Sequence, residues 1–190
     1  ILLTYECPGL VDGAYSKLAQ ITTIPQMREP LCIIGRDALA AGYVIRVGDS
    51  YRSFQEQVDL FCGLHGHDKA NDCYTLYKND PVKRSNYCAV PGTSNHGYGR
   101  AVDVSLMSKD YKYLYGVNSK TPCRSSWAPL RDDANTTAVK TFDGYLELVN
   151  LLANLFQKDG NFHRAVTEIW HFNFGPGTVL TGLPAKCGGN

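Results

Sequence analysis

Two short segments far apart in the chain carry side chains that must meet in space if they act together. His96 and Asp103 lie in the first segment, SNHGYGRAVD, and Glu168 and His171 lie in the second, EIWH. Two imidazoles and one carboxylate are a common ligand set for a hydrolytic zinc ion, which keeps a fourth position open for water. Glu168 adds a carboxylate beside the last ligand, as a base would require. The pattern predicts a metallohydrolase whose fold brings the two segments together.

The residues around His96 favour a turn followed by a strand. Gly97 and Gly99 allow the backbone to turn sharply after His96. Residues 99–106 then alternate as a strand does, with one face formed by Ala101, Asp103 and Ser105 and the other by Val102, Val104 and Leu106. A histidine in the turn and Asp103 on the strand can converge on one ion. On these residues alone, a hydrogen-bonded structural pair remains an open alternative.

The second segment predicts a final strand over residues 168–174. Alternation places the aromatic residues Trp170, Phe172 and Phe174 on a core face, and places His171 on the opposite face with Ile169 and Asn173. Glu168 can reach the side of His171 only if it precedes the regular strand. The base role of Glu168 therefore makes a specific demand on the backbone.

Length and composition predict one globular domain. The 190 residues can bury about 70% of their extended-chain surface, and an apolar fraction of 44% is ordinary. Lysine and arginine number 19 against 18 acidic residues, without a basic block, which argues against nucleic acid or an anionic membrane as a partner. No apolar run approaches the roughly 20 residues of a membrane-spanning helix. We expect a soluble monomer with no membrane span.

Periodicity and capping residues predict a fold of the α+β class. Expected helices span residues 36–41, 54–61 and 142–157, and expected strands span residues 43–47, 99–106 and 168–174. Residues 25–30 are expected to form a connection bounded by prolines. Ser53 and Glu56 have the spacing of a capping box at the second helix. The irregular alternation favours a small antiparallel sheet packed by helices over a doubly wound parallel sheet.

Seven cysteines predict a disulfide-reinforced protein from an oxidising compartment. They are Cys7, Cys32, Cys62, Cys73, Cys88, Cys123 and Cys187, and no CxxC pair occurs among them. The pairing stays open, although Cys7 and Cys187 lie near the two ends, where a bridge would tie a terminus down. Residues 1–6 lack the charged and apolar regions of a signal peptide. If the chain is secreted, we expect its numbering to begin at a processed or engineered start.

Three motifs in a fixed order resemble the zinc D-alanyl-D-alanine carboxypeptidase family. Its group includes the vancomycin-resistance dipeptidases, the L-alanyl-D-glutamate endopeptidases and the hedgehog signalling domain. A third segment, DSYRS at residues 49–53, is similar to the family's SGYRS and precedes a helix with a glutamine near its start, here Gln55. The other two patterns are SxHxxGxAxD, met by Ser94, His96, Gly99, Ala101 and Asp103, and ExxH, met by Glu168 and His171.

The resemblance implies a role for each matched residue. His96, Asp103 and His171 would bind one zinc ion, and Glu168 would be the general base toward the zinc-bound water and then protonate the leaving amine. Arg52 would stabilise the developing oxyanion or anchor the substrate. Ser94 and Gln55 would bind substrate. Two alternatives stay open: Arg52 as a surface ion-pair partner, and Ser94 as the cap of a turn.

The chain also departs from the family pattern. Asp49 and Ser50 stand where family members commonly have serine and glycine. The catalytic core is expected over residues 43–174 of a single domain, 1–190, with a cysteine-rich insertion at about 62–93 that would shape the substrate groove. The remaining histidines, His65, His67 and His163, are expected to be exposed loop residues.

Three functions follow from these observations. The first is a secreted zinc metallopeptidase that cuts a D-amino-acid-containing bond of the peptidoglycan stem peptide, as a D,D-carboxypeptidase or as an endopeptidase. The second is a non-catalytic, zinc-containing binding domain of the hedgehog type. Glu168 and Arg52 favour the enzyme, because a binding module needs neither a base nor an oxyanion donor. The third, a disulfide-stabilised wall-binding or lectin-like module, rests on composition alone.

Overall fold

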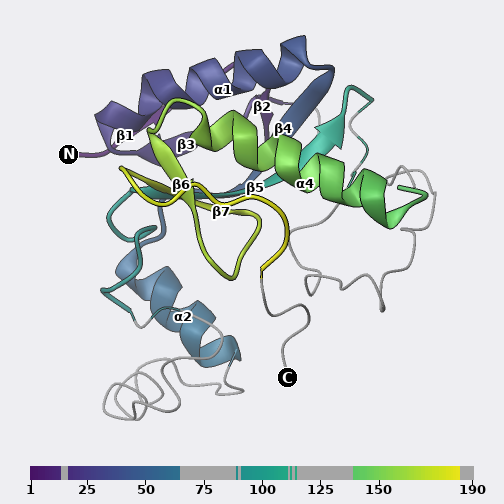
Figure 1. Ribbon diagram of the computed structural model, residues 1–190. Coiled ribbons are helices and arrows are strands. Elements are labelled where there is room, and N and C mark those ends of the chain that lie inside the picture. The colour runs from purple at the N-terminus through teal and green to yellow at the C-terminus, as the bar shows by residue number, and fades with distance from the viewer. Residues whose placement is uncertain are drawn as a thin grey trace.

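A computed structural model of the chain describes residues 1–13, 17–64, 89, 91–110, 112, 114 and 139–184. Within these residues, a five-stranded sheet is covered on one face by two helices that lie side by side, α1 (Arg28–Ala40) and α4 (Phe142–Gln157) (Figure 1). A third helix, α2 (Phe54–Leu64), lies apart from these two (Figure 1). The predicted mixture of helices and a small sheet is confirmed.

The sheet has the strand order β2-β4-β5-β7-β6. Its strands are β2 (Leu10–Val11), β4 (Tyr43–Asp49), β5 (Ala101–Ser108), β7 (His171–Phe174) and β6 (Phe162–Arg164). All neighbours pair antiparallel except β2, which pairs parallel with β4. The sheet is therefore mixed, not purely antiparallel as predicted. Parallel neighbours need a long crossover connection, and α1 lies in the chain between β2 and β4.

The first thirty residues form more structure than their sequence suggested. Strands β1 (Leu3–Tyr5) and β3 (Ile21–Thr23) pair as a separate two-stranded sheet, and a 3-10 turn, η1 (Pro25–Met27), leads directly into α1. The predicted connection over residues 25–30 and the helix start at Arg36 were therefore wrong. Pro30 lies in the first turn of α1, where a backbone N–H has no partner inside the helix, so the proline removes no hydrogen bond.

The capping box predicted for α2 is confirmed, and the structure adds a cap at α4. The backbone N–H of Glu56 donates to Ser53 Oγ at 3.2 Å, and the N–H of Ser53 donates to Glu56 Oε2 at 2.7 Å. This reciprocal pair fixes the first turn of α2 directly after Arg52. At α4, the Thr141 hydroxyl accepts from the N–H of Gly144 at 3.1 Å, and the helix spans the predicted residues 142–157.

The core behind the sheet is aromatic where α4 covers β7. The rings of Phe156 on α4 and Phe172 on β7 are stacked with centroids 4.2 Å apart, and both side chains are buried. Burial of each such side chain stabilises the fold by about 1.5–3 kcal/mol. Phe172 follows His171 directly, so this packing also fixes the strand that carries the histidine.

Disulfides reinforce the fold, as predicted. Cys7 pairs with Cys32 and so joins the N-terminal segment to α1, and Cys62 on α2 is also disulfide-bonded. The other four cysteines, His65 and His67 lie outside the described residues, as does most of the predicted insertion at 62–93. No helix in the described ranges has the length and apolar character needed to cross a membrane.

Candidate metal centre

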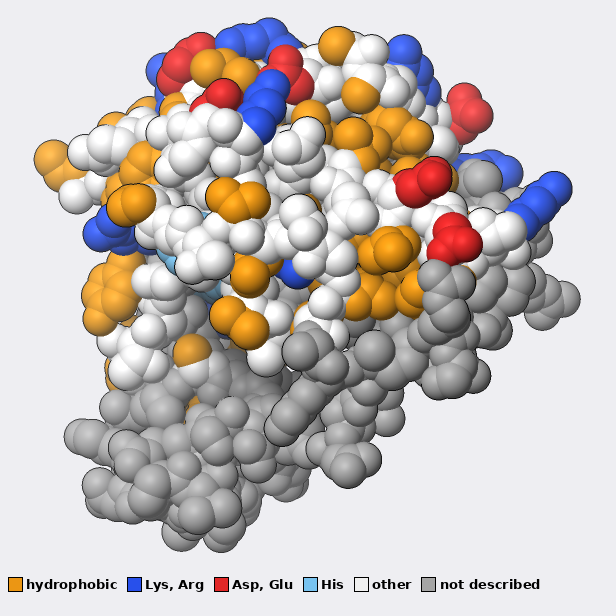
Figure 2. All heavy atoms as spheres, viewed as in Figure 1, with side chains coloured by type: hydrophobic (Ala, Val, Ile, Leu, Met, Phe, Trp, Pro, Cys, Tyr) orange, Lys and Arg blue, Asp and Glu red, His pale blue; other side chains and the backbone are white. Residues whose placement is uncertain are grey.

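Sheet pairing brings two of the three predicted ligands face to face. Asp103 on β5 is the register partner of His171, the first residue of β7, and His96 reaches them from the turn that precedes β5. Asp103 Oδ1 lies 2.8 Å from His171 Nδ1 and 3.3 Å from His96 Nε2, and the two nitrogens are 3.3 Å apart. On the face shown in Figure 2, histidine side chains are visible only deep in a recess of the surface.

The three donor atoms fit a metal ion. The candidate ligand atoms of His96, Asp103 and His171 lie within 4.8 Å of one another. Among the described residues, this is the one group of three or more such side chains that could hold a metal ion. Zinc–nitrogen and zinc–oxygen distances near 2.1 Å in a tetrahedron separate neighbouring ligands by roughly 3.3 Å. Both distances to His96 Nε2 have this value, and two imidazoles with one carboxylate suit zinc. The alternative of a purely structural pair is disfavoured by this convergence.

Hydrogen bonds to the outer ring nitrogens orient both imidazoles. His96 Nδ1 donates to the backbone carbonyl of Ser50 at 2.6 Å, and His171 Nε2 donates to Asn173 Oδ1 at 3.0 Å. Asn173 Oδ1 also accepts from Asn95 Nδ2 at 2.6 Å. Because these oxygens only accept, each outer nitrogen carries a proton, so in the neutral imidazoles that a metal ion requires the lone pairs of His96 Nε2 and His171 Nδ1 would face the centre. The sequence placed Asn173 on the face of His171 but did not reveal this bond.

The turn that carries His96 is tightly held. The N–H of Gly99 donates to His96 O at 3.0 Å, and the N–H of Arg52 donates to the same carbonyl at 3.2 Å. Gly99 has φ of +63°, and a Cβ built there would lie 2.5 Å from Leu2 Cδ2. Only glycine combines this backbone angle with so close a neighbour. Ser94 Oγ accepts from the N–H of His96 at 3.2 Å, so the serine does cap the turn.

Glu168 precedes the regular strand, as its proposed role as a base requires. It lies in the turn before β7, and its Oε2 is 3.9 Å from His171 Nδ1. The predicted strand over residues 168–174 was wrong in its first three residues, because β7 begins at His171. Ile169 is buried in the core rather than on the face of His171. Because Glu168 precedes the strand, its side chain does not follow the strand alternation, and its carboxylate lies beside the candidate ligand atoms.

The three charged groups of the site shift one another's pKa. Burial raises the pKa of the Glu168 carboxyl above its usual value, although His171 opposes this. Burial works against the charge of Asp103, yet hydrogen bonds from His171 and His96 outweigh it and hold the pKa well below its usual range. For His171, burial opposes the charge, but the hydrogen bond and charge of Asp103 prevail and raise the pKa. Asp103 is thus ionised, as a metal ligand would have to be, and the pKa of Glu168 is shifted in the direction that suits a general base.

A pocket of about 160 Å³ opens over the donor atoms. It is lined by Arg52, Leu60, Ala89, Ser94, His96, Asp103, Glu168 and His171. A neighbouring pocket of about 150 Å³ shares Arg52 and Ser94 and adds the aromatic walls Tyr51, Phe54 and Tyr98. The predicted metal ligands, the predicted base and Arg52 therefore border one cavity, which continues past Arg52 into a more apolar one.

Arg52 is held by two partners that the sequence did not identify. Its Nη1 donates to Gln57 Oε1 at 2.6 Å, and its Nη2 pairs with the Asp49 carboxylate. The alternative of an ion-paired arginine is thus correct, but the pair lies at the pocket and not on an open surface. Gln57 is buried and its Nε2 donates to Ala89 O at 2.7 Å.

Gln55 is not brought to either pocket. It is exposed, and its Nε2 donates to Asp59 Oδ1 at 2.9 Å. Gln57, two residues later, lines the pocket beside Arg52. Gln57 lies in the first turn of α2 and contacts Arg52, which only the packing of the helix reveals.

His163 is not the exposed loop residue that was predicted. It lies on β6, is half-buried, pairs in register with Asn173 and has its Nδ1 2.9 Å from Gly175 O. A three-residue strand carries too little alternation to be recognised in sequence.

Comparisons with known proteins identify one family. The model of the family VanY, D-alanyl-D-alanine carboxypeptidase, matches residues 25–177. A comparison with curated proteins gives no match.

Several solved structures are similar to this chain at low identity. A point mutant of the vancomycin-resistance D,D-pentapeptidase VanY, in complex with Zn(II), is 15% identical with a TM-score of 0.43, covering 82% of this chain and 74% of that one. The LD-carboxypeptidase LdcB is 16% identical with a TM-score of 0.46 and coverages of 92% and 68%. The D,D-dipeptidase VanXYg, with a D-Ala-D-Ala phosphinate analogue, is 19% identical with a TM-score of 0.43 and the same coverages. At these scores the structural likeness adds nothing to the family match.

Proposed function

Because the chain belongs to the D-alanyl-D-alanine carboxypeptidase family VanY, we propose that it is a zinc-dependent peptidase that cuts a D-amino-acid-containing bond of the peptidoglycan stem peptide. The observation that carries this proposal is the pocket in which Glu168 and Arg52 border the converging donors of His96, Asp103 and His171. The disulfides of the chain agree with a secreted protein, and we expect it to act as a monomer.

His96, Asp103 and His171 would hold the zinc ion through Nε2, Oδ1 and Nδ1. A zinc ion bound there supplies a Lewis acid for the scissile carbonyl and acidifies a water molecule. The carbonyl of Ser50 and the amide of Asn173 keep both imidazoles in the tautomer that such binding needs.

Glu168 is the residue that moves the proton. Its carboxylate lies beside the donor atoms, and burial raises its pKa toward the operating pH, where a general base is most effective. It accepts the proton of the attacking water and delivers it to the nitrogen of the leaving amine. The peptide bond is thereby replaced by a carboxylate and a free amine.

Arg52 and Ser94 bind and orient the substrate. Both line the pocket over the donors and the pocket next to it, so they lie where a peptide crossing from one pocket to the other would pass. A guanidinium held by Gln57 and Asp49 can donate to the scissile carbonyl as negative charge develops on its oxygen.

The proposal is tested with purified, zinc-loaded protein and defined muropeptides. Mass spectrometry identifies any fragment released, and zinc is measured in the same sample. We expect stoichiometric zinc and one cleaved stem-peptide bond. Stoichiometric zinc with every muropeptide left intact would instead identify a non-catalytic zinc-binding domain, and a chain without zinc would contradict both.

A further inference from the structure

Building on the proposed function, we propose that Asp49 makes the site discriminate against a free terminal carboxylate, so that the chain cuts an internal peptide bond in preference to releasing the last residue. Asp49 acts through Arg52 and is a specificity-determining residue, not a catalytic one.

Arg52 and Asp49 form an ion pair at the edge of the candidate site. Arg52 is the cationic side chain among the described residues that line the pocket over the donor atoms. Its Nη2 is paired with the Asp49 carboxylate and its Nη1 donates to Gln57. The side chains of Arg52 and Asp49 are only 15% and 28% exposed. Water therefore screens this pair less than it screens a surface pair.

Strand register places Asp49 beside the metal centre. Asp49 is the last residue of β4, and after an irregularity at Val47 it pairs with Asp103, which in turn pairs with His171. The three residues form one row across β4, β5 and β7. The position of Asp49 is thus fixed by the same sheet that fixes the ligands.

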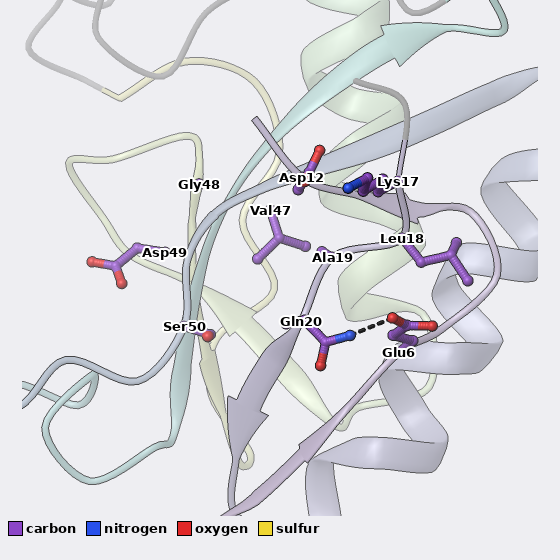
Figure 3. A pocket seen from close by; sticks show the side chains of 10 residues that line it. All are labelled: Glu6, Asp12, Lys17, Leu18, Ala19, Gln20, Val47, Gly48, Asp49 and Ser50. Carbon is purple, nitrogen blue, oxygen red and sulfur yellow. Dashed lines mark hydrogen bonds between the residues drawn. The ribbon is translucent and has the colours of Figure 1, made fainter. Parts of the chain in front are cut away.

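Asp49 also borders a second pocket that contains a lysine, but its carboxylate pairs with Arg52 and not with that lysine. This larger pocket, of about 390 Å³, lies along the end of β4, with Lys17 among its lining residues. Figure 3 shows the Asp49 side chain at the edge of this pocket, directed away from Lys17. Within the described part of the chain, the cation that pairs with Asp49 is therefore Arg52.

The negative charge of Asp49 affects a substrate with a free terminal carboxylate differently from a substrate cut at an internal peptide bond. An exopeptidase must hold the free α-carboxylate of the leaving residue, and an arginine is the usual partner for that group. Here a substrate carboxylate would have to share Arg52 with Asp49 and would be repelled by it. An internal bond presents only neutral amides, to which the other N–H groups of Arg52 can still donate.

The first experiment compares a free acid with its amide. N-acetylated D-Ala-D-Ala and the same peptide as a C-terminal amide are titrated into zinc-loaded protein, with Glu168→Ala as the background to prevent turnover. We expect the amide to bind at least as tightly as the acid. Tenfold tighter binding of the acid would overturn the inference. This binding readout holds whether or not the muropeptide assay finds cleavage, so failure of the proposed function is seen separately.

The second experiment removes the charge of Asp49 alone. In Asp49→Asn the acid peptide should gain affinity, and the rate of terminal-residue release relative to internal cleavage should rise, each by about tenfold. Asp37→Asn is the matched control, because Asp37 pairs with Lys158 between α1 and α4, away from the pocket. The control should leave the acid-to-amide ratio unchanged. An unchanged ratio in Asp49→Asn, with zinc still bound, would contradict the role of Asp49. Asp49→Ser provides a second variant if the first folds poorly.

Discussion

Asp103 and His171 face each other across two paired strands, whereas Glu168 and Arg52 lie where regular structure has ended. The candidate ligands Asp103 and His171, which form the ligand side of the site, are positioned by the register of β5 and β7 and by the aromatic packing behind β7. The proposed catalytic residues, which form the catalytic side, take their geometry from the turn before β7 and from the pairing of Arg52 with Asp49, the last residue of β4. In the proposed function, metal binding and catalysis would therefore depend on different parts of the structure, and mutation would separate them.

Loss of a strand-borne ligand should have the largest effect. His171→Ala leaves two donors, so we expect loss of stoichiometric zinc and of all measurable hydrolysis. Metal analysis after dialysis checks the first and the muropeptide assay checks the second. His163→Gln is the matched control, since His163 lies on neighbouring β6 and bonds Gly175 instead. Zinc retained in His171→Ala would mean that the donors are misassigned.

Loss of the turn-borne base should abolish catalysis without loss of metal. In Glu168→Ala we expect hydrolysis to fall by about a hundredfold or more, the scale of general-base catalysis, while zinc stays stoichiometric. Rates with one muropeptide and zinc content of the same preparation provide the measurement. Activity equal to the wild type would remove Glu168 from the mechanism.

Loss of an orienting amide should weaken the ligand side by an intermediate amount. Asn173→Ala removes the acceptor for His171 Nε2, so zinc affinity should fall by about ten- to a hundredfold. Competition with a chelator measures this affinity. Added zinc should restore the activity of this variant, as it cannot for Glu168→Ala. If zinc affinity is unaffected, the Asn173 bond does not orient the ring.

A change at the arginine should weaken the catalytic side alone. Arg52→Lys keeps the charge but cannot donate to Asp49 and Gln57 through one planar group. We expect kcat/KM to fall by about tenfold or more, with zinc affinity unchanged. Steady-state kinetics beside a chelator titration distinguishes this from a fall in metal occupancy.

Removal of the N-terminal disulfide should have the smallest effect on activity. Cys7→Ala combined with Cys32→Ala opens a crosslink across 25 residues, which costs about 3 kcal/mol of unfolding free energy by chain entropy. Denaturant unfolding should show the loss. Zinc affinity and kcat at low temperature should match the wild type, because the bridge lies between the N-terminal segment and α1.

Local patterns in the sequence predicted the parts of the site that local structure determines. His96 and Asp103 lie in one short turn-and-strand unit, and α4 follows from an apolar stripe over residues 142–157. The capping box at Ser53 likewise depends on three consecutive peptide units.

Contacts between distant segments account for what the sequence did not predict. β2 has two residues, and its parallel pairing depends on the crossover through α1. The bond from Asn95 to Asn173 joins residues that are far apart in the chain. Gln57 was passed over for Gln55 because only the packed helix shows which glutamine faces Arg52. Strand alternation placed Ile169 on the face of His171, but Ile169 is buried and β7 begins only at His171.

The close approach of Leu2 to Gly99 gives the metal centre a connection to the outside of the molecule. Residues that flank the β1–β3 sheet lie against the turn that carries His96, and the N–H of Ile24 donates to Gly99 O at 3.0 Å. The position of the turn that carries His96 therefore depends in part on residues at the N-terminal end of the chain.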